Sequence, residues 1–306
     1  MHLRSSRRGF LAGAGSLASA AALMPNRLFA LSSAASNLRF GYTAMTWGKE
    51  EKQAIDDISA LGYAGIQFRI DAVTEFKPAE LRGILAEHKL TFVALSSGEV
   101  SIDPAIEADE IAKHVANAKY VHDAGGLYLQ VLDQLKPYPR SVTPQECKRL
   151  GQLLTKIGKQ TADLGIPLGY HNHMNTIGEH PANLDIILES SDPRYVKLEL
   201  DTAHSVAGGG DPAKAIEKYH DRLLFLHLKD VIDIPLGSEN SKYPFKFVEL
   251  GRGRVNIPAV FAAIDNVKFS GWAVVELDRV PDKSRTAKEC AAISRDYLEQ
   301  EIGVKL

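Results

Sequence analysis

Two apolar runs in the second half of the chain each end in residues that can hold a metal ion. The first closes with Asp201 and is followed by His204, and the second contains His227 and Asp230. A turn rich in Gly, Asp and Pro and a short amphipathic segment separate the runs, which is the pattern of a parallel strand–helix–strand unit. Polar residues that close such strands lie at the C-terminal edge of the sheet, where α/β proteins hold their reactive groups.

Two other predicted strands carry similar side chains at their ends. The segment GYHNH contains His171 and His173, and the last apolar run, AVVELD, contains Glu276. Because side chains alternate along a strand, Glu199 is expected on the same face as Asp201. Imidazole and carboxylate groups without thiolates suit Mn2+, Zn2+, Co2+ or Fe2+ and argue against a structural zinc site. The four strand ends therefore predict a shared site for one divalent metal ion.

Each of these residues also has a purely structural explanation. A single His at a strand end is more often hydrogen-bonded than metal-bound, Asp201 could cap the helix that follows it, and Glu276 could pair with an arginine. These explanations must treat four such residues at the same level of neighbouring strands as a coincidence. A shared metal site is therefore the better interpretation.

The predicted elements place these residues at one end of a barrel. From residue 38 to the end of the chain, short apolar runs alternate with amphipathic helical patterns. The predicted strands span residues 39–43, 65–70, 91–96, 127–132, 167–172, 196–201, 223–228 and 272–277. Such βα units predict an α/β fold, a single-domain (β/α)8 TIM barrel over residues 36–306, with an open doubly wound sheet as the alternative. No GxGxxG follows the first strand and no GxxxxGK[ST] occurs, so a nucleotide-binding fold has no support.

Two connections differ from the rest. A Pro-rich connection covers Lys136 to Pro139, and an unusually long one runs from Val231 to Asn256 and contains Arg252 and Arg254. Loops of this length in compact domains are usually functional or disordered. Arg252 could close over a ligand, although a solvated loop charge explains it equally well.

Composition limits the classes of partner. The 306 residues carry a formal net charge of -2, so the chain lacks the basic footprint of a nucleic-acid-binding protein. Cys147 and Cys290 lie far apart in helical patterns and are predicted to be buried free thiols.

The first 35 residues are predicted to be a twin-arginine-type signal peptide that is removed from the mature protein. They contain Arg7 and Arg8 followed by Gly-Phe-Leu, and an apolar run that is shorter than the roughly 20 residues needed to span a bilayer. We therefore expect a periplasmic or otherwise exported protein that meets the Tat translocation machinery during export and is not stably inserted in a membrane.

The motifs DTAH, HLKD and VELD resemble the xylose-isomerase-like barrel superfamily of sugar isomerases, epimerases and dehydratases. GYHNHMNTIGE, LDTAHSVAGGGDP and HLKDV are similar to those of inosose dehydratases and of lyases and epimerases that act on 3-keto-glycosides. The resemblance implies a divalent metal, commonly Mn2+, held by Asp201, His227, Glu276 and a fourth ligand. The usual glutamate of the fifth strand is absent, so we assign that ligand to His173, with His171 as the alternative.

The resemblance also implies the chemistry. Proton abstraction next to a carbonyl, through a metal-stabilised enediolate, leads to isomerisation, epimerisation or loss of a β-substituent. The candidates for acid and base are His204, Lys229, His171 and Glu199. The candidates for binding substrate hydroxyls are Gln67, Arg69, Glu99, Gln130 and Arg252.

The expected function is that of a carbon–oxygen lyase or sugar isomerase/epimerase acting on a keto-sugar, either a 3-keto-glycoside or a keto-cyclitol. A sugar isomerase or epimerase of free ketoses, a non-catalytic sugar-binding barrel and, more weakly, an endonuclease of the same superfamily are the alternatives. A homo-oligomer is compatible with the sequence.

Overall fold

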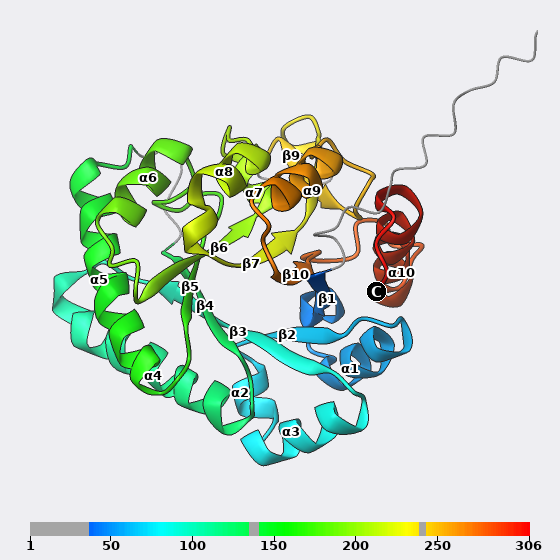
Figure 1. Cartoon of the computed structure of the whole chain (residues 1–306), viewed down its shortest axis with the longest axis horizontal. Helices are drawn as coiled ribbons and strands as arrows, with labels where there is room; N and C mark the ends of the chain where they lie inside the picture. The colour runs from blue at the N-terminus through cyan, green and yellow to red at the C-terminus, as the bar shows by residue number, and fades with distance from the viewer. Residues whose placement is uncertain (1–36, 135–140, 239–242) are drawn as a thin grey trace, which may run out of the picture. The chain divides into compact units, whose positions relative to one another are not determined.

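The parallel strands close on themselves to form a barrel. The computed structural model describes residues 37–134, 141–238 and 243–306. The barrel strands are β1 (Leu38–Thr43), β2 (Gly65–Arg69), β3 (Thr91–Val100), β4 (Tyr128–Asp133), β5 (Leu168–His171), β6 (Val196–Asp201), β7 (Leu223–Leu228) and β10 (Gly271–Val275). They follow the order β1-β10-β7-β6-β5-β4-β3-β2 around the closed barrel (Figure 1). The predicted (β/α)8 barrel is confirmed, and the open doubly wound sheet is wrong.

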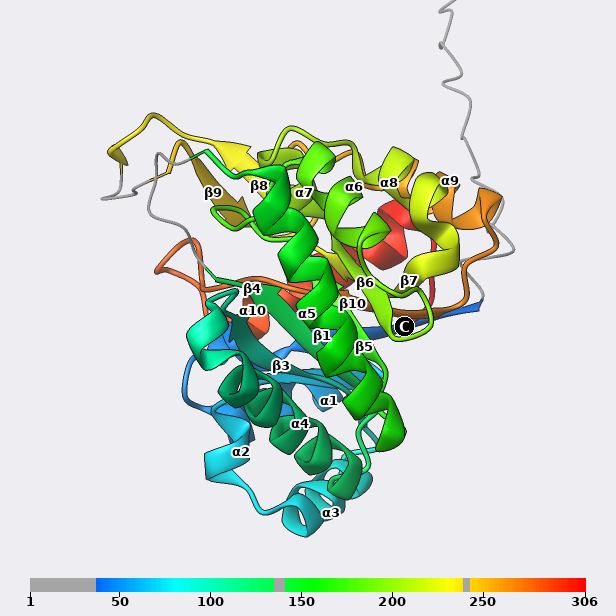
Figure 2. The same ribbon diagram turned by 90° about the vertical axis from the view of Figure 1, so that its left-hand side faces the viewer.

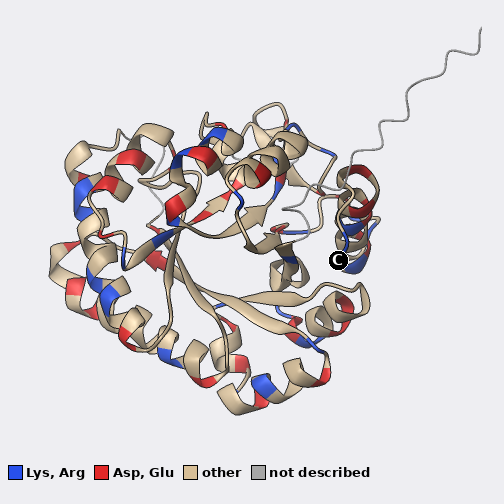
Figure 3. Cartoon of the chain, in the orientation of Figure 1, with Lys and Arg blue, Asp and Glu red and all other residues tan. Residues whose placement is uncertain are grey.

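Helices cover the outside of the barrel (Figure 1). They are α1 (Glu51–Ala60), α2 (Ala72–Glu75), α3 (Pro78–Glu87), α4 (Glu107–Asp123), α5 (Pro144–Asp163), α6 (Pro181–Glu189), α7 (Thr202–Ala207), α8 (Pro212–Tyr219), α9 (Ile257–Asn266) and α10 (Ala287–Tyr297). Thr143 and Thr286 begin α5 and α10 with capping boxes. Charges of both signs are interspersed over these helices (Figure 3). Within the described ranges, the model contains no helix with the length and hydrophobicity of a membrane span.

A large aromatic side chain fills the barrel interior near the start of the strands. Trp272 is fully buried with Val93 and Phe225, and the ring of Phe225 stacks on Tyr128 at 5.5 Å between centroids. Gly65 admits this ring, since a Cβ atom at that position would lie only 2.6 Å from the Trp272 side chain. The interior is therefore packed at this end, which leaves the C-terminal end of the strands for polar groups.

The long connection after β7 contains a hairpin. Strands β8 (Asp230–Asp233) and β9 (Phe245–Val248) pair antiparallel beyond the end of the barrel (Figure 2). The sequence analysis identified residues 231–256 as an unusually long connection and did not predict the hairpin within it. The predicted signal peptide over residues 1–35 and the Pro-rich connection at 136–139 lie outside the described residues.

One buried carboxylate holds the hairpin and the segment that returns from it. Asp230 is fully buried and accepts hydrogen bonds from the backbone N–H groups of Val231, Gly251, Gly253 and Val255, at 2.8 to 3.1 Å. A Cβ atom on Gly253 would lie 2.1 Å from the Asp230 carboxylate, so only glycine fits there. The sequence suggested that Asp230 could hold a metal ion, but its oxygens are occupied by this loop.

Removing this carboxylate should loosen the hairpin and destabilise the fold. We expect Asp230→Ala to lower the free energy of unfolding by about 3 kcal/mol or more, because it leaves several buried N–H groups without an acceptor. Urea denaturation followed by circular dichroism measures the loss. Asp233→Ala is the matched control, since its exposed carboxylate pairs with Arg254 on the surface, and should change the value by about 0.5 kcal/mol or less. Equal losses in the two variants would contradict this role of Asp230.

Candidate metal centre

Four side chains from neighbouring strands converge at the C-terminal end of the barrel. His171 ends β5, Asp201 ends β6, His227 lies near the end of β7, and Glu276 follows β10. All four are buried, and one ligand atom from each lies within 4.8 Å of the others. The strand register explains this convergence, because Asp201 pairs directly with His227 across β6 and β7. We call these four residues the strand-end cluster.

A fifth side chain, Glu199, lies against the cluster. Its Oε2 is 2.7 Å from His171 Nδ1, and its Oε1 is 3.1 Å from His227 Nδ1. Even so, these four atoms and Asp201 Oδ2 are buried without a hydrogen bond of acceptable geometry to any described residue. Buried polar atoms without such partners are costly, and a bound cation would satisfy them. The imidazole and carboxylate donors fit Mn2+, Zn2+, Co2+ or Fe2+.

The raised pKa of His227 also indicates that the cluster favours a positive charge. Burial alone would lower its pKa, but the charges of Glu199 and Glu276 outweigh this effect and raise the pKa to about 9. His227 Nδ1 lies 3.1 Å from Glu276 Oε2. The carboxylates therefore create a negative potential that favours a cation at this position, either a proton or a metal ion.

Neighbouring groups orient the cluster. Gln67 Oε1 lies 2.8 Å from His227 Nε2 and accepts its proton, which directs Nδ1 toward the carboxylates. Asp201 Oδ1 accepts from the backbone N–H of His204 at 2.7 Å and caps α7. The side chain of Asn172 bonds to both the N–H and the C=O of Asp201. The capping role considered for Asp201 is therefore present, and its Oδ2 remains directed at the cluster.

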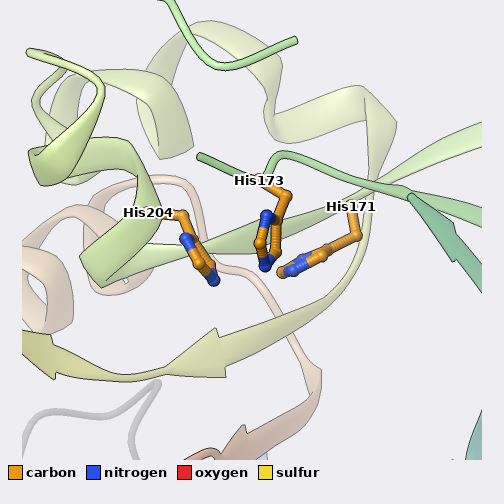
Figure 4. Close-up of side chains that lie close together, drawn as sticks. All are labelled: His171, His173 and His204. Atoms are coloured by element: carbon orange, nitrogen blue, oxygen red, sulfur yellow. The ribbon is translucent and has the colours of Figure 1, made fainter. Parts of the chain in front are cut away.

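Three histidine rings form a second group beside the first (Figure 4). His173 and His204 lie 3.9 Å apart between ring centroids, and His171 lies 5.5 and 5.4 Å from them. His173 donates its Nδ1 proton to the carbonyl of Met174 at 2.7 Å, which leaves Nε2 unprotonated. Burial lowers the pKa of His173 to about 3 and that of His204 well below its usual value, so both rings are neutral at pH 7.

The structure groups His171, and not His173, with Asp201, His227 and Glu276. Our sequence analysis assigned the fourth ligand to His173 and kept His171 as the alternative. That assignment followed the family position of the absent glutamate, and the choice between the two histidines stays a prediction. β5 ends at His171, and His171 also belongs with His173 and His204 to a second group whose ligand atoms lie within 4.8 Å of one another. The chain turns after His171, and His173 lies beside α7 with His204.

Lys229 enters the site from the residue after β7. It is fully buried, and its Nζ lies 2.8 Å from Glu276 Oε1, 2.5 Å from Asp278 Oδ1 and 3.2 Å from His204 Nε2. Burial alone would lower the pKa of Lys229, but Asp278 and Glu276 outweigh it and raise the pKa above its usual value. The sequence left open whether this lysine turns into the pocket or into solvent. It turns inward, and its ammonium group is charged.

The remaining predicted residues lie in different surroundings. Gln130 is buried in β4, and its Oε1 has no hydrogen-bond partner among the described residues. Arg69 is exposed and pairs with Asp71 at 3.2 Å, Glu99 is exposed, and Arg252 lies 4.0 Å from Glu249. Their role in binding substrate hydroxyls stays a prediction.

Sequence reasoning missed Phe247. Its ring lies 4.1 Å from Lys229 Nζ and 4.9 Å from the ring of His204, so it forms part of the wall beside these groups. It was missed because it belongs to the long connection, in which no strand was predicted. The alternating aromatics in YPFKFV were the available signal for a strand there.

Known proteins share this fold, and two relatives share about a quarter of the aligned residues. Inosose dehydratase from Geobacillus kaustophilus is 24% identical over 292 residues, covering 86% of this chain and 94% of that protein. Inosose dehydratase from Lacticaseibacillus casei is 26% identical over 280 residues, covering 84% and 92%. The crystal structure of an IolI protein with a bound zinc atom superposes with a TM-score of 0.73 at 17% identity, covering 87% and 98%. The family model described as xylose isomerase-like TIM barrel matches residues 55–297, so the chain belongs to that family, as its motifs predicted.

Proposed function

We propose that this protein is a divalent-metal-dependent lyase or isomerase that removes a proton next to the carbonyl of a keto-sugar. The observation that carries the proposal is the strand-end cluster of His171, Asp201, His227 and Glu276, with the buried ammonium of Lys229 against it. The two inosose dehydratase relatives support an enzyme that acts on a cyclic keto compound.

The side chains divide into ion-holding and proton-moving groups. A divalent ion, with Mn2+ as our first choice, would be held by the strand-end cluster and would make the carbon next to a carbonyl more acidic. We assign His171 rather than His173 as the fourth ligand, because its ligand atom lies with those of Asp201, His227 and Glu276. The Glu199 carboxylate, 2.7 Å from His171 Nδ1 and 3.1 Å from His227 Nδ1, adds negative charge beside the ion site.

Proton transfer involves Lys229 and His204 together with His173. The environments of Lys229 and His204 shift the two pKa values in opposite directions, so that at pH 7 the lysine is charged and the imidazole is neutral. His204 Nδ1 accepts a hydrogen bond from the backbone N–H of Met174 at 3.3 Å, so the neutral ring carries its proton on Nε2, 3.2 Å from Lys229 Nζ. Both groups can therefore donate to a substrate oxygen, and the proton taken from the substrate falls to the unprotonated Nε2 of His173. His173 Nε2 is unprotonated and belongs to a half-buried ring, so it can accept a hydrogen bond from a substrate hydroxyl.

Elemental analysis of protein purified without chelator tests the ion site. We expect about one equivalent of Mn, Zn, Co or Fe, lost in Asp201→Ala and in His171→Ala and kept in His173→Ala. Added metal should raise the melting temperature of the protein and of His173→Ala only. If His173→Ala loses the metal and His171→Ala keeps it, the ligand assignment is wrong. If neither the unaltered protein nor any variant binds metal after reconstitution, the metal-dependent mechanism is wrong and a non-catalytic sugar-binding barrel becomes the better hypothesis.

Replacing the buried ammonium tests the proton-transfer assignment. Lys229→Met should lower kcat on a 3-keto-glycoside or keto-cyclitol about 100-fold or more while the metal content stays unchanged. Lys214→Met, at an exposed lysine of α8, should retain full activity. Because the change leaves two carboxylates without their cation, circular dichroism of the same samples checks folding, and Lys229→Arg provides a charged second variant. Wild-type turnover in both Lys229 variants would remove this lysine from the mechanism.

We also propose that the protein is exported through the twin-arginine route, which favours a 3-keto-glycoside outside the cytoplasmic membrane over a cyclitol of internal catabolism. The support is the leader sequence with Arg7 and Arg8. The double variant Arg7→Lys, Arg8→Lys should keep the protein in the cytoplasm, as measured by fractionation of a bacterial host. Finding the unaltered protein only in the cytoplasmic fraction would end this proposal.

A further inference from the structure

An aromatic ladder leads from the catalytic groups to the outer part of the β8–β9 hairpin. Phe247 lies at its inner end, with its ring against Lys229 and His204. The ring of Phe245 follows at 5.6 Å, and that of Tyr243 stacks on Phe245 at 5.5 Å with an interplanar angle of 11°. Phe245 and Phe247 lie on one face of β9, because every second residue of a strand points to the same side. Tyr243 precedes the strand, and its stacking on Phe245 continues the row of rings.

The outer part of this surface is accessible and also carries charged groups. Tyr243 is 36% exposed, and Phe245 is partly exposed. Phe245 pairs directly with Asp233 of β8, so both side chains lie on the same face of the hairpin. Asp233 accepts a hydrogen bond from Arg254 at 3.0 Å, and both side chains are exposed to solvent. Flat rings therefore lie beside groups that can bond to hydroxyls.

We infer that the ladder is a binding subsite for the second ring of a glycoside, so that the substrate is a keto-glycoside and not a single-ring keto-sugar. This inference rests on the proposed function, because it places the keto ring at the strand-end cluster. The C–H face of a sugar ring packs on aromatic faces, while carboxylate and guanidinium groups bond to its hydroxyls. A single ring held at the cluster and against Phe247 does not use the outer rings of Phe245 and Tyr243, whereas a second ring of a glycoside would pack on them.

The continuity of the ladder with the catalytic groups favours this occupant over a second copy of the chain. A protein partner would have no need for rings that begin beside Lys229, and the exposed Asp233–Arg254 pair suits hydroxyls better than an apolar interface. A change in the oligomeric state on altering the ladder is therefore an outcome that would overturn the inference.

The experiment compares two-ring and one-ring ligands in Phe245→Leu, which keeps an apolar side chain but removes the flat ring. We expect KM for a 3-keto-disaccharide to rise about tenfold more than KM for a keto-cyclitol, with kcat little changed. Lys246→Ala is the control, because this side chain points to the opposite face of the same strand. Equal effects on both substrates, or no effect on either, would overturn the subsite, as would dissociation of an oligomer in size-exclusion chromatography.

A binding measurement separates this inference from the proposed function. Calorimetry of the metal-loaded protein with an unoxidised glucose disaccharide needs no turnover. If the wild-type protein turns over no keto-sugar but binds the disaccharide about tenfold more tightly than Phe245→Leu does, the subsite stands and the proposed reaction fails. If the reaction occurs and the disaccharide binds equally to both proteins, the reaction stands and the subsite fails.

Discussion

Negative charge buried at the end of the barrel is the constraint on which the functional site depends. Glu199, Asp201 and Glu276 are buried, and each has an oxygen within 3.7 Å of His227 Nδ1, where carboxylates repel one another and have lost their hydration. Positive charge must compensate them, and Lys229 and His227 supply part of it. Oxygens of Glu199 and Asp201 have no hydrogen-bond partner among the described residues, so the site has atoms that a further cation would satisfy. The same buried carboxylates therefore set the electrostatic stability of the site and would provide ligands for a catalytic ion.

The fold meets this constraint by placing apolar side chains near the start of the strands and charged side chains at their C-terminal ends. Trp272 and Phe225 seal the interior near the start of the strands, so the charged groups have water and ligands on one side only. Secondary hydrogen bonds then fix each charged group, as Gln67 does for His227 and Asn172 for Asp201. Because these side chains are held rigidly, small differences in their positions decide which of their atoms would face an ion.

The sequence predicted the strand ends well and their exact geometry poorly. Apolar runs that finish in Asp, His or Glu are visible in any barrel strand, so Asp201, His227 and Glu276 could be placed together before the structure was known. Where β5 stops could not be read from GYHNH, because distant groups decide it. Asp133 of β4 accepts from the Tyr170 hydroxyl and from the backbone N–H of Ile177, which fixes the turn after His171. The hairpin was equally hidden, since it depends on pairing between strands separated by a long connection.

The barrel strands and the hairpin also place different structural constraints on their side chains. Residues at strand ends are constrained by the barrel register, so the reacting groups cannot change place without loss of the site. The hairpin is anchored by Asp230 through the backbone of its return segment, and the aromatic side chains take no part in these hydrogen bonds. Its side chains can therefore vary while the catalytic groups stay fixed. Under the proposed function, the barrel would determine which bond reacts and the hairpin which molecule presents that bond.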